Sequence, residues 1–317
     1  MTIPPAPALA PRVSPLDAVG EAIEYTKRNL FPFRFERWLA LGFVAFLDQC
    51  GRGRVSGFQA PTTPGGSGGT SGGGGGPDLS RVTEWLGSHV GLVMVIAAIV
   101  LALIVALTAL VLWINSRGIF MYLDNVATGR ADVVRPWGEH AERANSLFAW
   151  RFVIGIAVLV VLIVLAGLAG LLVFGYSKGR IGGGVALALG LLGLLPILLV
   201  LVLAAGLVSM ALRDFVAPLQ WRLGVSCGDA GRVAWGLVRG HPGSFAVYVG
   251  LKIAFGIVAA IVALAAGCMT CCCGFLPVVA QTILQPLLYF ERAWSLAFLR
   301  QLGHDVFAPP TAGAAVP

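Results

Sequence analysis

The sequence predicts an all-α membrane protein, a bundle of six transmembrane helices with amphipathic helices on its cytosolic face. Residues 185–212 are an uncharged apolar run, longer than the roughly 20 residues that cross the hydrocarbon core of a bilayer as a helix. Hydrophobic residues make up 57% of the chain and charged residues only 12%, whereas about a quarter of the residues in soluble domains are charged. Arg213 and Asp214 follow the run directly, which indicates that the chain re-enters water there.

The chain is predicted to contain one membrane domain, residues 14–302, between a disordered lead, residues 1–13, and a disordered tail, residues 303–317. The domain opens with Ser14, a helix-capping residue, and Pro15, which is favoured in the first helical turn. Apolar residues of the following stretch fall on one helical face. We therefore expect an amphipathic helix that lies in the membrane interface or packs on other cytosolic parts of the chain.

The first spanning candidate, residues 30–47, is the weakest of the six. Arg34, Glu36 and Arg37 interrupt its start, and only residues 38–47 are cleanly apolar. Because arginines near a helix end can extend to the membrane surface, a true span is predicted. A re-entrant segment is the alternative, since the clean part is short.

A glycine-rich stretch, residues 51–80, follows the first candidate and contains GGSGGTSGGGGG. Such a composition gives a flexible coil that cannot bury a core, so this stretch is predicted to be an outer loop. The remaining five spans are predicted near residues 90–114, 152–175, 185–212, 244–267 and 274–300.

The basic residues predict the orientation of these spans. With six spans and an inner N-terminus, the inner segments hold sixteen lysines and arginines and the outer segments hold five. Cytoplasmic loops of membrane proteins carry such an excess of positive charge. Both termini are therefore expected in the cytoplasm.

The inner segments suggest a threefold internal repeat. In each, an arginine is followed eleven or twelve residues later by a glycine, a common helix-ending residue. The pairs are Arg117 and Gly129, Arg213 and Gly224, and Arg292 and Gly303. Chance similarity imposed by the apolar composition is the alternative interpretation.

Five of the six cysteines are predicted on the outer side, where disulfides persist. These candidate disulfide cysteines are Cys50, Cys268, Cys271, Cys272 and Cys273. The alternative is that they act as small apolar residues at the membrane boundary. Metal or haem attachment is disfavoured, because a single Cys-x-x-Cys lacks a second ligand pair and is not followed by histidine.

Lys252 is the one charge well inside an otherwise apolar span, and such a residue is a functional-site hypothesis by default. Glu291 lies at a similar distance from the inner end of its own span, so Lys252 and Glu291 are predicted to form an intramembrane ion pair. Alternatively, Lys252 extends to the inner surface without a partner. Gln281 and Gln285 share a helix face and either bond to neighbouring helices or line a polar path.

No catalytic, cofactor-binding or metal-binding set emerges from the sequence, so we expect a protein that is not an enzyme. The histidines are scattered, and no nucleotide-binding or nucleophile-elbow motif is present. The net charge of +7 arises at span ends, where topology requires it. We therefore expect no nucleic-acid partner.

Three stretches carry a resemblance to a known family: SPLDAVGEAIEYTKRNLFPFRFERWLALGF, SRGIFMYLDNVATG and CMTCCCGFLPVVAQTILQPLLYFERAWSLAFLRQLG. They resemble an uncharacterised family of prokaryotic multi-pass membrane proteins. More distantly, the layout is similar to the membrane domain that accompanies some glycerophosphodiester phosphodiesterases. The resemblance implies a six-helix protein of the prokaryotic plasma (inner) membrane, and it carries over no catalytic residues.

The sequence thus predicts a non-enzymatic membrane scaffold or interaction module. Its expected partners are the lipid bilayer and either another membrane protein or a second copy of itself. The alternative is a small permease or exporter with a polar path near Lys252, Glu291, Gln281 and Gln285. A deep polar cavity around those four residues would favour transport, and a dry interior would disfavour it.

Overall fold

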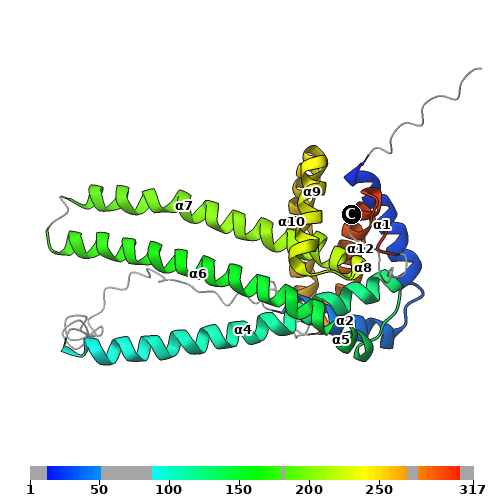
Figure 1. The fold of residues 1–317 in the computed structure, drawn as a ribbon, viewed down its shortest axis with the longest axis horizontal. Coiled ribbons are helices and arrows are strands. Elements are labelled where there is room, and N and C mark those ends of the chain that lie inside the picture. The colour runs from blue at the N-terminus through cyan, green and yellow to red at the C-terminus, as the bar shows by residue number, and fades with distance from the viewer. Residues whose placement is uncertain (1–12, 51–87, 180–182, 270–277, 308–317) are drawn as a thin grey trace, which may run out of the picture.

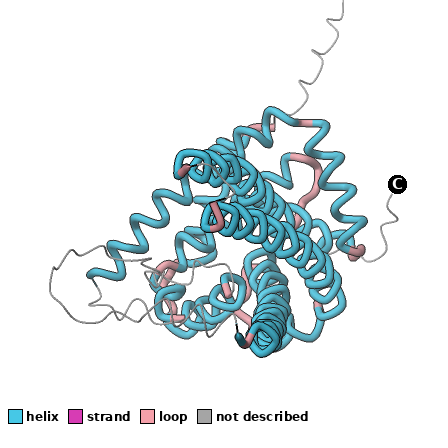
Figure 2. Tube along the Cα trace, turned by 90° about the vertical axis from the view of Figure 1, so that its left-hand side faces the viewer, coloured by secondary structure: helices cyan, strands magenta, loops and turns pink. Residues whose placement is uncertain are grey.

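The computed structural model describes residues 13–50, 88–179, 183–269 and 278–307, and every regular element in these ranges is helical (Figure 2). The helices are α1 (Pro15–Leu30), α2 (Phe35–Gln49), α4 (Val90–Thr128), α5 (Val134–Glu139), α6 (Ala141–Ser177), α7 (Gly184–Ala211), the π-helical segment η1 (Leu212–Val216), α8 (Ala217–Leu223), α9 (Cys227–Gly240), α10 (Pro242–Met269), α11 (Val279–Ile283) and α12 (Gln285–Gln301).

The molecule has two parts with different surroundings. Helices α4, α6 and α7 extend side by side toward one end, while the shorter helices gather at the other (Figure 1). We call the second part the head; it comprises α1, α2, α5, α8, α9, α12 and the last third of α4. The buried hydrophobic residues lie mainly in the head, whereas α7 has no buried residue.

Four helices in the described ranges are long and apolar enough to cross a membrane: Gly91–Thr128, Ala141–Ser177, Gly184–Leu223 and Pro242–Cys268. Their most apolar windows are 0 to 6% buried within the molecule. Exposing this much apolar surface to water is unfavourable, whereas lipid covers it without that penalty. The structure therefore supports a membrane protein.

The predicted count of six spans is not confirmed. The segment predicted at residues 30–47 forms α2, which has 15 residues and packs against the buried end of α4. Residues 274–277 of the segment predicted at 274–300 lie outside the described residues, and the rest forms α11 and the 17-residue α12, which packs along α1. Taken singly, α2, α11 and α12 fall short of the roughly 20 residues that a span normally needs, although only Leu284 separates α11 from α12.

The helix ends follow the local signals in the sequence. The Ser14 hydroxyl caps α1 by accepting a hydrogen bond from the Asp17 N–H. Gly129, Gly224 and Gly303 follow α4, α8 and α12 with φ of 66°, 70° and 89°, a left-handed conformation that glycine adopts without steric penalty. The three predicted helix stops are thus present, although the threefold repeat as a whole is not confirmed.

The amphipathic helix α1 lies on α12 and closes one side of the head. Ala18 and Ala22 are fully buried there, and the Trp294 indole N–H donates to the Pro15 carbonyl at 3.2 Å. Arg300 of α12 bonds to Glu21 at 2.6 Å. Of the two roles predicted for this helix, packing on other parts of the chain is the one seen.

Close helix approach at Gly118 yields a stability prediction. A Cβ atom at this position would overlap the backbone of Leu47 and Asp48, which cannot move aside as a flexible side chain would. We expect Gly118→Ala to reduce the stability of the protein by about 1–3 kcal/mol, the usual cost of overpacking. Thermal unfolding of the purified protein in detergent, followed by tryptophan fluorescence, measures this effect.

Gly155→Ala is the matched control, because no atom lies within 4 Å of its added Cβ in α6. This change should leave the melting temperature unchanged or raise it slightly, since alanine favours the helix. Equal melting temperatures for the two variants would contradict the proposed close contact between α2 and α4.

Candidate functional site

A cluster of five charged residues lies where the apolar helix α7 enters the head. We call it the charged junction; its members are Asp48, Arg213, Asp214, Lys252 and Glu291. Their side chains are 15% exposed at most. Buried charges are rare in proteins unless they are paired, so their gathering at one point identifies the candidate site.

Local structure explains how these residues meet. Arg213 and Asp214 lie in η1, a single wide turn between α7 and α8 that buries both adjacent side chains. Such π-helical turns occur frequently at functional sites. Asp48 comes from the last turn of α2, Lys252 from the middle of α10, and Glu291 from α12.

Arg213 connects two carboxylates of different helices. Its guanidinium forms two hydrogen bonds with the Asp48 carboxylate, of which Nε to Oδ1 measures 3.3 Å. Its Nη1 lies 3.1 Å from Oε1 of Glu291. A planar guanidinium suits this bridging because it presents several N–H donors in fixed directions.

Lys252 occupies the other side of the junction. Its Nζ lies 3.0 Å from Oδ2 of Asp214 and 3.5 Å from Oε1 of Glu291. The ammonium also lies over the rings of Tyr248 and Trp294, 5.6 and 5.3 Å from their centroids. Two carboxylates and two aromatic rings therefore surround the Lys252 ammonium within an apolar helix.

Hydrogen bonds to the backbone extend the junction into α4 and α6. Arg292 is fully buried and donates to the carbonyls of Arg213 and Ile119 at 2.8 and 3.2 Å. Asn115 of α4 donates to the Leu47 carbonyl at 3.0 Å, and Arg151 of α6 donates to Asn115 Oδ1 at 2.5 Å. Asn115 also donates to the Asp48 carbonyl, so it pairs with backbone at the C-terminal end of α2, where carbonyls lack intrahelical partners.

A cleft opens beside the junction between α7 and α10, with a volume of about 410 Å³. We call it the α7–α10 cleft. Apolar residues line most of its walls, and Arg213, Asp214, Lys252 and Glu291 form its polar floor. A concave site with mostly apolar walls and a few convergent polar groups is the usual form of a small-molecule site.

The structure brings together some of the residues that the sequence singled out. Lys252 and Glu291, predicted as an intramembrane pair, lie within 3.5 Å of each other. Gln285 is buried and donates to the Tyr122 hydroxyl at 3.0 Å, and Gln281 accepts from the Val278 N–H at 3.1 Å. Neither glutamine lines the α7–α10 cleft.

Three members of the charged junction were not predicted as site residues. Arg213 and Asp214 were interpreted as the point where the chain returns to water, because they directly follow an apolar run. Asp48 lies at the end of the weakest spanning candidate. An adjacent pair of opposite charges after an apolar helix was the available signal, but sequence spacing does not reveal burial.

The cysteines are only partly within the described residues. Cys50 and Cys268 carry free thiols, the first half-buried and the second exposed. Cys271, Cys272 and Cys273 lie outside the described residues, so a disulfide among them stays a prediction. In the described ranges no three histidine, cysteine or carboxylate side chains are arranged to hold a metal ion.

A second buried cluster surrounds Asp124 in the last turns of α4. Its carboxylate accepts from Arg135 at 2.6 Å and from the Trp221 indole at 3.2 Å, and it lies 3.3 Å from His140 Nε2. These contacts attach α5 and α8 to α4. We assign this cluster a structural role.

Comparison with known proteins gives a family for this chain. A family of unknown function, DUF7544, matches residues 13–306. The chain belongs to the DUF7544 family. No curated protein and no solved structure matches it. The DUF7544 assignment fits the predicted resemblance to an uncharacterised family, whereas these comparisons give no support to the distant similarity with the membrane domain of glycerophosphodiester phosphodiesterases.

Removal of Arg213 from this DUF7544 protein should be strongly destabilising. Arg213→Met leaves the buried carboxylates of Asp48 and Glu291 without their bridging cation, and breaking a buried pair typically costs about 3–5 kcal/mol. Adding Asp48→Leu should recover part of the loss, because the pair is then removed as a unit. Melting temperatures of the single and double variants in detergent measure this coupling.

The exposed pair of Arg232 and Asp229 is the control for that cycle. The Arg232 side chain is 83% exposed, so its pairing is screened by water and contributes little. Arg232→Met should therefore hardly change the melting temperature. An equal effect of Arg213→Met and Arg232→Met, or purely additive effects of Arg213→Met and Asp48→Leu, would contradict the role of the charged junction.

Cys227 should react slowly with thiol reagents. It is buried at the start of α9, and burial raises the pKa of its thiol to about 11. The reactive species is the thiolate, which would be roughly a thousandth of the thiol at pH 8 with this pKa. Iodoacetamide should modify a variant with Cys227 as its single cysteine slowly at pH 8, and the rate should rise steadily toward pH 11.

The exposed Cys268, retained as the single cysteine of a second variant, provides the comparison. Faster modification of Cys268 at pH 8 is expected. Rapid modification of Cys227 at pH 8, with no further increase in rate above pH 9, would show that the thiol is exposed and that its pKa is not raised.

Proposed function

We propose that this protein is a non-enzymatic integral-membrane scaffold or interaction module. Its apolar helices would anchor it, and its head would present a surface to a partner. The bonding within the charged junction supports this proposal, because its charges and the nearby Arg292 are engaged with one another and with the backbone. Such groups hold helices in place more readily than they form an open path for a solute.

The observation that carries the proposal is an exposed aromatic surface on the head, which we call the phenylalanine face. It comprises Phe31, Phe33, Phe35, Leu39 and Phe43, which are 40–63% exposed. Phe35, Leu39 and Phe43 recur every four residues along α2, so they share one side of the helix. A contiguous exposed patch of large apolar side chains is typical of an interaction surface.

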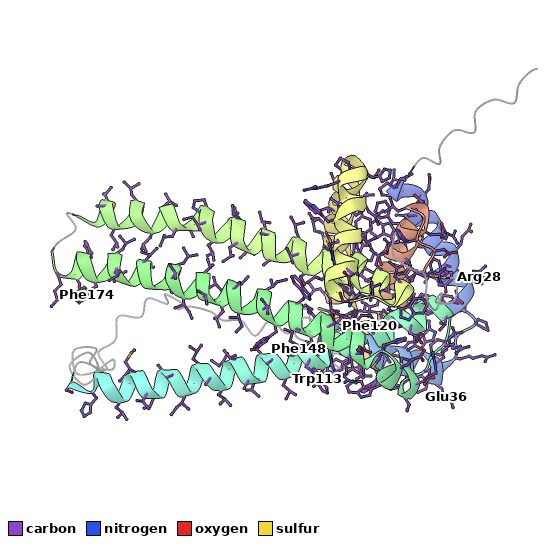
Figure 3. All side chains as sticks on the ribbon, in the orientation of Figure 1. Arg28, Glu36, Trp113, Phe120, Phe148 and Phe174 are labelled. Atoms are coloured by element: carbon purple, nitrogen blue, oxygen red, sulfur yellow. The ribbon has the colours of Figure 1, made fainter. Side chains whose placement is uncertain are left out.

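The position of this face leaves it accessible to a partner in or beside the membrane. Glu36 lies at the end of the molecule opposite Phe174, which marks the free end of the apolar helices (Figure 3). Arg37 bonds to the Gly129 carbonyl at 2.7 Å, beyond the apolar part of α4. The phenylalanine face therefore lies on the surface of the head, where a membrane protein or a second copy of the chain can reach it.

The finer membrane arrangement belongs to the same proposal. It comprises six spans, cytoplasmic termini and a location in the prokaryotic plasma membrane. The orientation is supported by the excess of basic residues in the inner segments of the six-span arrangement, sixteen against five. For α11, the exposed apolar residues Val279 and Ile283 support contact with the membrane.

A small permease or exporter is the second candidate, and the α7–α10 cleft favours it. Two of the four residues predicted to line a polar path, Lys252 and Glu291, form part of the cleft floor. Gln281 and Gln285 are buried elsewhere in the described structure. A route across the membrane would have to continue from the cleft through the packed junction.

Site-specific photo-crosslinking tests the scaffold proposal. Benzoyl-phenylalanine placed at Leu39, in the middle of the phenylalanine face, should give a discrete protein adduct in intact cells after illumination. The same group at Leu199, an exposed residue of α7, is the matched control and should react with lipid only. Adding Phe35→Asp should abolish the protein adduct at position 39 without altering the control.

Indistinguishable products at positions 39 and 199 would contradict the scaffold proposal. An adduct whose mass equals that of two chains would identify a second copy as the partner, and any other discrete mass would identify a different membrane protein. Mass spectrometry of the excised adduct separates these two outcomes.

A further inference from the structure

We propose that the α7–α10 cleft binds a zwitterionic glycerophospholipid of the surrounding bilayer. The headgroup would lie on the charged floor, and the first part of one acyl chain would lie between the two helices. This inference depends on membrane insertion of α7 and α10 and does not depend on the scaffold role. The four observations that carry it are the walls, the floor, the direction of the cleft and its charge balance.

The walls match a hydrocarbon chain. Apart from Ser209, they are formed by aliphatic, aromatic and glycine residues of the two helices, among them Val202, Leu203, Leu207, Met210, Ile253 and Phe255. Gly206 lies between them and leaves space on its helix face, with no atom within 4 Å of an added Cβ. A chain in this space would cover apolar surface without displacing any side chain.

The floor matches a headgroup that carries both signs of charge. Glu291 is its most exposed member, with 15% of its side chain accessible, and Lys252 is next at 8%. Their charged atoms lie 3.5 Å apart, so one small headgroup can contact both. The Lys252 ammonium would donate to the phosphate oxygens, and the Glu291 carboxylate would accept from the ammonium group of the lipid.

The direction of the cleft agrees with the orientation of lipids in a leaflet. The floor lies where the apolar run of α7 ends at Arg213, and the walls continue along α7 toward Val202, inside the apolar run. Along α7, a bound lipid would have its headgroup at the end of the apolar run and its chain beside the run itself. Lys252 would reach that headgroup from the middle of α10. The lipid could enter sideways from the bilayer without inverting.

The charge balance selects among lipids. The four residues of the floor comprise two cations, Arg213 and Lys252, and two carboxylates, Asp214 and Glu291. Directly behind the floor, Asp48 bonds to the Arg213 guanidinium and Arg292 bonds to the Arg213 carbonyl, so these two residues add one charge of each sign. A headgroup with a net negative charge would bring an unbalanced charge to this poorly solvated site, whereas a zwitterion would not. Phosphatidylethanolamine should therefore be preferred to phosphatidylglycerol.

Native mass spectrometry of the full-length protein tests this selection. The protein is purified in mild detergent, exchanged into an equimolar mixture of phosphatidylethanolamine and phosphatidylglycerol with the same chains, and released from detergent in the spectrometer. We expect one phosphatidylethanolamine to remain bound, with about a tenfold preference over phosphatidylglycerol, which corresponds to about 1.4 kcal/mol.

Two variants locate the bound lipid. Gly206→Phe places a ring in the cleft and should reduce retention of phosphatidylethanolamine about tenfold, again about 1.4 kcal/mol. Gly193→Phe is the matched control on the same helix, because Gly193 also has open space around its Cβ and does not line the cleft. Glu291→Gln should retain a lipid but lose the preference for phosphatidylethanolamine, since its floor would carry a net positive charge.

Several results would overturn the inference. Equal lipid retention by Gly206→Phe and Gly193→Phe would show that lipid binds elsewhere. A preference of the unaltered protein for phosphatidylglycerol, or no lipid retained at all, would exclude a zwitterion site in the cleft. Melting temperatures of all variants, measured in parallel, show whether a loss of lipid reflects a blocked cleft or an unfolded protein; if Gly206→Phe unfolds, the smaller Gly206→Leu replaces it in the same comparison.

Discussion

Arg213 is the residue on which the arrangement of this protein most depends. Its guanidinium binds Asp48 of α2 and Glu291 of α12, while its own carbonyl accepts from Arg292. It lies at the exact point where α7 changes from a helix without buried residues to the buried turn η1. One side chain thus connects the end of a membrane helix to two helices of the head.

The constraint behind this arrangement is the cost of an unpaired charge away from water. Each cation of the charged junction lies near more than one carboxylate, and Glu291 contacts both Arg213 and Lys252. A network of this kind is weak evidence for high stability, because a well-packed apolar replacement is often as stable. Its value is specificity, since other registers of α7 against α2 and α12 would leave charges unpaired. The same network provides the polar floor of the α7–α10 cleft.

The rest of the structure consists of apolar helix surfaces that suit contact with lipid and a head with a packed core. The apolar faces of α4, α6 and α7 are exposed within the chain and suit lipid. The head instead contains an ordinary packed core, which Tyr248 of the adjoining α10 joins: its ring stacks on Phe298 and lies tilted against Trp294, with centroids 4.9 and 5.2 Å apart. The phenylalanine face is the exception, because it combines large apolar side chains with a position on the head. Binding of a partner would therefore cover apolar surface at this face.

The sequence by itself determined the class of the protein and many of its helix boundaries. Uncharged runs such as residues 185–212 predict membrane helices because composition and length alone decide that question. Capping residues are equally local, so Ser14 and the glycines at 129, 224 and 303 marked helix ends correctly. The proximity of Lys252 and Glu291 could also be predicted, because the distance of each residue from the inner end of its predicted span can be counted along the sequence.

Only the tertiary structure decided which apolar segments are covered by protein and which charges are buried. Residues 30–47 are predicted as a span, and the structure shows that most of them lie in α2, Phe35–Gln49, which packs against the buried end of α4 with close contact at Gly118. Asp48, Arg213 and Asp214 join the charged junction through contacts between different helices. Asp48 and Arg213, for example, are 165 positions apart in the sequence. Local sequence carries no record of such pairing, since burial and ionic partners depend on how distant helices pack.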